Sequence, residues 1–133
     1  PLGHPLGANF RELIFRTRYP ITPKLQVDAR IIRYMQGEDD DNSNWGSNIF
    51  QSAILEEGDL SIENEYGNTI GQGIRSNVWI TGIDLSYELA HNVYLDLGYF
   101  RRSKDSEDDA RDQNVSFFSG GLRINLNRLR FDF

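Results

Sequence analysis

Alternation of apolar and polar side chains with a period of two constrains this chain more than any other feature of its sequence. It is clearest over residues 78–89, where the odd positions from Trp79 to Leu89 are apolar, aromatic or threonine and the last four even positions are small or acidic. Successive side chains of a β-strand point to opposite faces, whereas a helix repeats every 3.6 residues. The segment is therefore expected to be a strand with one apolar face and one polar face.

Four further segments alternate in the same way, namely residues 12–19, 25–31, 93–100 and 118–126. Together they predict an all-β fold of five antiparallel strands connected up and down. The polar face is expected to carry four acidic and four basic residues: Glu12, Arg16, Arg18, Asp28, Arg30, Asp84, Asp96 and Arg123. A half-exposed soluble sheet and the wall of a transmembrane barrel both show this period, so alternation alone does not separate them.

The lengths of the connections favour the barrel. Residues 20–24 and 89–92 form short turns, and residues 37–72 and 102–114 form long loops, so short and long connections alternate. Outer-membrane barrels have this arrangement, with short periplasmic turns and long extracellular loops. Because a barrel needs at least about eight strands, we expect residues 1–133 to be the C-terminal part of one larger barrel domain.

The last residues give a second indication of an outer-membrane protein. Leu129, Phe131 and Phe133 lie on one face of the predicted final strand, and the chain ends in an aromatic residue. This arrangement resembles the C-terminal signal that the barrel-assembly machinery recognises. We therefore expect that machinery to be a partner, together with the lipid and lipopolysaccharide of the outer membrane. An aromatic strand of a soluble sheet is the alternative.

Acidic residues gather in the two long loops. Residues 37–73 contain nine acids and no Lys or Arg, and residues 104–114 contain five acids and two bases. The whole chain has a formal net charge of -6. Since nucleic-acid binding requires a basic surface, no nucleic-acid partner is expected. Solvation of ordinary loops would also account for most of these acids.

The side chains that catalysis requires are scarce. The chain has no cysteine, and its two histidines, His4 and His91, are expected at opposite ends of the strands. Without a histidine near the acidic loops a hydrolytic triad has no base, so we expect no enzyme activity and no cofactor.

A calcium loop is a weaker candidate. Asp39, Asp41 and Ser43 offer oxygen ligands at alternate positions, as calcium loops do, but the glycine of the EF-hand pattern is missing. A solvated acidic surface is therefore the preferred interpretation, and no metal is expected.

Aromatic and amide side chains are interspersed in the longer loop. The candidates are Trp45, Asn48, Phe50, Tyr66 and Asn68. Sugars bind through their apolar faces on aromatic rings and through hydrogen bonds to amides, so these residues form a candidate polysaccharide site. Equally, the aromatic side chains could form a small core that keeps a loop of this length ordered.

Three strings in the sequence look like those of a known family. They are His4–Phe10, Asn44–Phe50 and Tyr66–Gly73. With the Arg-Phe-Asp-Phe end, they resemble the C-terminal region of Wzi-like capsule-assembly barrels and related gliding-motility-associated outer-membrane proteins. The resemblance implies a cell outer membrane location in Gram-negative cells and a role in attachment or assembly of surface polysaccharide (capsule). The alternative is a structural or partner-binding barrel subunit of a gliding, secretion or nutrient-uptake complex.

Overall fold

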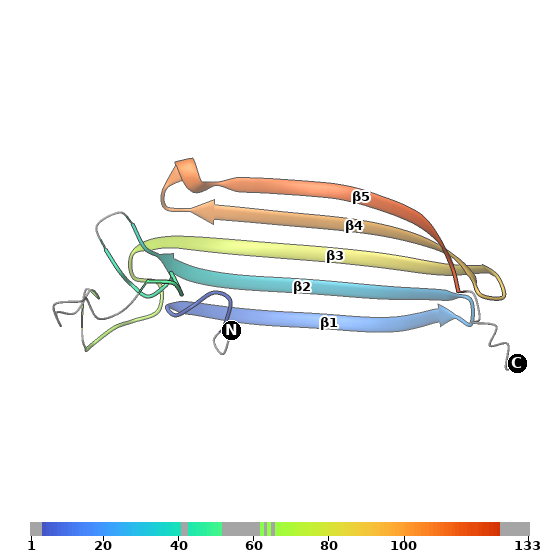
Figure 1. Ribbon diagram of the computed structural model, residues 1–133, viewed down its shortest axis with the longest axis horizontal. Helices are drawn as coiled ribbons and strands as arrows, with labels where there is room; N and C mark the ends of the chain where they lie inside the picture. Colours follow the sequence, from blue (N-terminus) through green and yellow to red (C-terminus); the bar gives the residue numbers. More distant parts are fainter. Residues whose placement is uncertain (1–3, 41–42, 52–61, 63, 65, 126–133) are drawn as a thin grey trace, which may run out of the picture.

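Five antiparallel strands form one sheet in the computed structural model, which describes residues 4–40, 43–51, 62, 64 and 66–125 (Figure 1). The elements in chain order are β1 (Phe10–Thr22), β2 (Leu25–Glu38), β3 (Ile74–Ala90), β4 (Val93–Ser106), the short 3-10 helix η1 (Asp109–Arg111) and β5 (Gln113–Ile124). Each strand pairs with its neighbours in sequence, and the described strands leave the sheet open at β1 and β5. The predicted all-β, up-and-down topology is confirmed.

The two ends of the sheet differ. The short β1–β2 and β3–β4 turns lie at one end, called the turn end below, and the β2–β3 and β4–β5 connections lie at the other, called the loop end (Figure 1). The β2–β3 connection covers residues 39–73, close to the predicted loop 37–72. The predicted second loop, 102–114, is wrong in extent, because β4 and β5 continue along the sheet and leave only residues 107–112 between them.

Apolar side chains of all five strands lie on one face, called the apolar face. Directly paired residues of neighbouring strands share a face. One such row crosses the sheet from β1 to β5 through Tyr19, Val27, Leu85, Leu97 and Gly120. Along β4 the apolar positions run from Val93 to Tyr99, about 20 Å at the rise of a strand. The predicted charged residues lie on the opposite face, but apolar side chains such as Ile32, Phe100 and Phe117 share that face towards the loop end.

Polar side chains bound the apolar face towards the loop end. Arg33 pairs with Trp79 and Trp79 with Ser103, and the Arg33 guanidinium lies 4.9 Å from the centre of the Trp79 ring. Arg101 and Ser116 pair one step nearer the turn end. The apolar surface is thus a band across the sheet rather than the whole of one face.

The sheet has no hydrophobic core of its own. Val78 is the only apolar side chain buried among the described residues. Large side chains of the apolar face stay open, and Phe118 is 83% and Leu122 61% exposed. An apolar sheet face requires a covering layer, and Figure 1 shows a single layer of strands. Within the described part of the chain no helix is long and apolar enough to cross a membrane.

Candidate functional site

The face opposite the apolar band, called the charged face, is held by ion pairs. Arg16 and Arg18 both reach Asp28, at 3.2 and 3.0 Å. Arg123 binds Asp96 at 2.8 Å, and the Ser86 hydroxyl donates to the same carboxylate. Each of these contacts joins neighbouring strands. Arg123 also donates a hydrogen bond of 3.0 Å to the Ser86 hydroxyl, and this bond reaches from β5 across β4 to β3. These bonds hold the charged side chains in place across the sheet.

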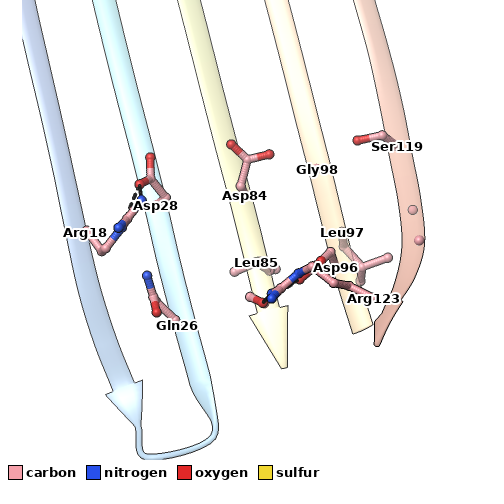
Figure 2. A pocket seen from close by; sticks show the side chains of 13 residues that line it. Arg18, Gln26, Asp28, Asp84, Leu85, Asp96, Leu97, Gly98, Ser119 and Arg123 are labelled. Carbon is pink, nitrogen blue, oxygen red and sulfur yellow. Dashed lines mark hydrogen bonds and ion pairs between the residues drawn. The ribbon is translucent and has the colours of Figure 1, made fainter. Parts of the chain in front are cut away.

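A hollow of about 510 Å³ opens on the charged face near the turn end (Figure 2). Asp84, from β3, stands between the Arg18–Asp28 and Arg123–Asp96 pairs, and the small residues Gly98 and Ser119 lie beside it on β4 and β5 (Figure 2). Small side chains at these paired positions create the hollow. Its lining combines these charged side chains with glycines and with Leu85 and Leu97.

At the loop end, three segments join to form what we call the end cap: residues 4–9, 43–49 and 67–73. Asn9 is its centre. The Asn9 amide donates to the carbonyl oxygens of Gly37 (3.1 Å) and Gln72 (2.7 Å), and its oxygen accepts from Gly71 N–H (2.7 Å). A further bond of 2.8 Å joins Ala8 N–H to the Gly46 carbonyl. The end cap is therefore tied to the ends of β1, β2 and β3.

The carboxylate of Asp39 shapes the next part of the end cap. It accepts backbone N–H groups from Trp45 (2.5 Å), Ser47 (3.4 Å) and Asn48 (2.9 Å). The three N–H groups lie six to nine residues further along the chain than Asp39. Asp39 is thus engaged with the backbone.

The candidate calcium ligands are only partly described. The Ser43 hydroxyl accepts the Asp40 N–H at 3.4 Å, and Asp39 is engaged as above. Asp41 lies outside the described residues. Within the described residues no group of three or more His, Asp or Glu side chains is arranged to hold a metal ion.

A cluster of opposite charges links the loop end of β2 to β4 and η1. Lys104 Nζ lies 2.6 Å and Arg111 Nη1 3.4 Å from the Glu38 carboxylate, and Arg111 also donates to the Asp39 carbonyl at 3.1 Å. Burial raises the pKa of Glu38, but hydrogen bonds and charge from Lys104, with further bonds from Ser76 and Arg111, outweigh it. The pKa of Glu38 therefore lies below its ordinary 4.5, and the group is ionised at neutral pH.

The structure brings two of the five predicted carbohydrate residues together. Trp45 and Asn68 line a hollow of about 230 Å³ in the end cap. Its other lining residues were not predicted as site residues: Ala8, Asn9, Thr69, Ile70 and Gln72. They belong to two of the family-like strings, His4–Phe10 and Tyr66–Gly73, which the fold brings together with Trp45 of the third string.

The remaining three predicted residues do not line that hollow. Phe50 is 92% and Tyr66 82% exposed, so neither packs into a loop core among the described residues. The Asn48 side chain accepts the Phe50 N–H at 3.0 Å. The proposed assembly-signal residues, Leu129, Phe131 and Phe133, lie outside the described residues.

The two histidines lie at opposite ends of the sheet. His4 stacks on Phe10 with 4.4 Å between ring centres and lies 3.3 Å from Glu12. His91 lies in the β3–β4 turn. Comparison of the chain with protein-family models, with curated proteins and with solved structures found no match.

Proposed function

We propose that this chain forms part of the wall of a transmembrane β-barrel in the outer membrane of a Gram-negative cell. The single observation that carries the proposal is the exposed apolar band on a sheet that buries almost nothing of its own. Its height of about 20 Å is close to the ~25 Å lipid-facing band of such barrels. In this arrangement the turn end faces the periplasm and the loop end faces outwards.

The charged face supports the same arrangement. Lumen-facing residues of membrane barrels are polar and alternate with lipid-facing ones. Here Arg18–Asp28 and Arg123–Asp96 pairs occupy the positions between the apolar ones. Ion pairs of this kind would neutralise charges that lie inside a barrel, beside a solvated hollow.

We further propose that the end cap binds surface polysaccharide without catalysis, as a component of its attachment or assembly. Trp45 and Asn68 share one hollow, and Phe50 and Tyr66 present open aromatic faces. Lipopolysaccharide and the barrel-assembly machinery are the further partners proposed. A structural or partner-binding subunit of a gliding, secretion or nutrient-uptake complex is the second candidate, since exposed aromatic residues are also typical of protein interfaces.

The test changes Trp45 and Tyr66 together to Ala in the full-length protein on cells. The barrel should assemble normally, because both residues lie outside the hydrogen-bonded strands, and surface polysaccharide retained per cell should fall. His91→Ala, at the turn end, is the matched control. Normal assembly with unchanged polysaccharide would favour the partner-binding alternative, and failure to assemble would make the aromatic residues structural.

A further inference from the structure

Among the described residues, the lining of the end-cap hollow contains no charged side chain. The lining residues are Ala8, Asn9, Trp45, Asn68, Thr69, Ile70 and Gln72. This lining therefore offers an anionic ligand no cation with which to pair.

Polar groups in the hollow are left available for a ligand. Within the described residues, nothing bonds to the Thr69 hydroxyl or the Gln72 amide N–H, while the Asn68 amide donates to the Asn64 carbonyl and keeps its oxygen open. These groups include donors and acceptors, as the hydroxyl groups of a sugar require. Asn9 is different, because its three bonds hold the wall in place.

The size of the hollow limits what enters. Its 230 Å³ lies below the roughly 300–1,000 Å³ of sites that hold drug-sized ligands. A space of this size suits one sugar ring better than a longer stretch of chain. The edge of Trp45 is fixed against Gly73, whose position leaves no room for a side chain, since a Cβ there would lie 2.6 Å from Trp45 Cδ1.

We propose that this hollow binds one uncharged sugar ring of a surface polysaccharide, with Trp45 supplying the apolar surface and Asn68, Thr69 and Gln72 the hydrogen bonds. The inference rests on the proposed polysaccharide-binding function and adds the site and the charge class of the ligand. Phe50 and Tyr66 lie outside the hollow and are not required for this selectivity.

The test measures binding of the full-length protein, purified in detergent, to an array of glucose, galactose and mannose oligosaccharides beside uronate-containing ones. Wild type should bind neutral members and leave the uronates at background. Trp45→Ala should weaken binding to the tightest-bound neutral oligosaccharide about tenfold, which corresponds to ~1.4 kcal/mol. Trp45→Phe should restore most of it, and Thr69→Val, which keeps the shape and removes the hydroxyl, should weaken it measurably. Phe50→Ala is the matched aromatic control.

The outcomes separate the two proposals. Equal or stronger binding to uronates would overturn the neutral-ring inference and leave polysaccharide binding standing. Binding that Trp45→Ala and Thr69→Val leave unchanged would place the ligand elsewhere on the surface and overturn the site. No binding to either class, with the heat-resistant barrel intact, would overturn both the inference and the polysaccharide role. A barrel that does not insert in membranes would instead overturn the wall proposal.

Discussion

Asn9 holds the loop end together through one small side chain. Its amide serves three backbone groups, on Gly37, Gln72 and Gly71, and its own backbone has φ of 59°. Asn is among the residues that tolerate this left-handed conformation best. Both the side-chain amide and the backbone conformation therefore favour Asn at this position.

Asn9→Asp tests this role because it keeps the size of the side chain and the acceptor for Gly71 N–H. The carboxylate cannot donate to the Gly37 and Gln72 carbonyls, and it brings negative charge towards them. We expect a loss of about 1–3 kcal/mol in local stability. Hydrogen exchange of residues 67–73 should accelerate, while the β1–β2 turn at residues 20–25 serves as the control. Unchanged exchange in the end cap would contradict the role of Asn9.

Glu38 gives the loop end a dependence on pH. Its folded-state pKa lies below the ordinary 4.5 because Lys104 and Arg111 stabilise the ionised form despite burial. A group with a lowered folded pKa stabilises the fold above its unfolded pKa and loses that contribution as the pH falls through the folded value. The stabilisation should thus be complete above about pH 5 and decline below pH 4.5.

Glu38→Gln should remove most of this acid sensitivity. At neutral pH the variant should lose about 1.5–3 kcal/mol, the range for a hydrogen bond to a charged group. Amide hydrogen exchange of residues 107–112 should then be faster in the variant than in the wild type at pH 6. This difference between variant and wild type should narrow by pH 3. A difference that stays constant with pH would exclude the Glu38 mechanism.

At the scale of the strand, neighbouring residues of β2 face different surroundings. Val27 lies on the apolar face and Gln26 on the charged face. In a membrane barrel Val27→Arg should cost about 2–4 kcal/mol near the bilayer centre, whereas Gln26→Arg should cost little. Heat-resistant migration on gels and surface protein levels measure assembly. Equal levels of both variants would show that the apolar face does not meet lipid.

Strand identity could be read from the sequence, but strand length could not. Alternation disappears beyond Phe100, because Arg101 to Asp105 place polar side chains on both faces. Backbone pairing does not depend on side-chain polarity, and Lys104 still pairs with Gln113. The alternation therefore predicts a strand that ends at residue 100 and a next strand that begins at residue 118, whereas β4 continues to Ser106 and β5 begins at Gln113.

The candidate site could be predicted only in part for a related reason. Trp45 and Asn68 belong to residue types that a sugar site uses, and those types are visible in the sequence. Asn9, Thr69 and Gln72 join them only because hydrogen bonds bring residues 9, 37 and 72 together. These residues lie in the family-like strings His4–Phe10 and Tyr66–Gly73, but the strings do not show that they meet, because that contact depends on strand register.

At the scale of the whole molecule, the central fact is an uncovered sheet. A single layer that exposes Phe118, Leu122 and their neighbours cannot be stabilised by burying them against its own described residues. Lipid on the apolar face, and further strands along the edges at β1 and β5, would supply what is missing. Whether the sheet is part of a membrane barrel wall therefore depends on what contacts its apolar face.

The most direct measurement labels this face in a bilayer. The chain contains no cysteine, so single cysteines introduced in turn at residues 95–100 of β4 can carry an environment-sensitive fluorophore in the full-length protein. In bilayers with brominated acyl chains, the account predicts strong quenching at Leu95, Leu97 and Tyr99 and weak quenching at Asp96, Gly98 and Phe100. Uniform quenching along β4, or quenching at the even positions only, would contradict it.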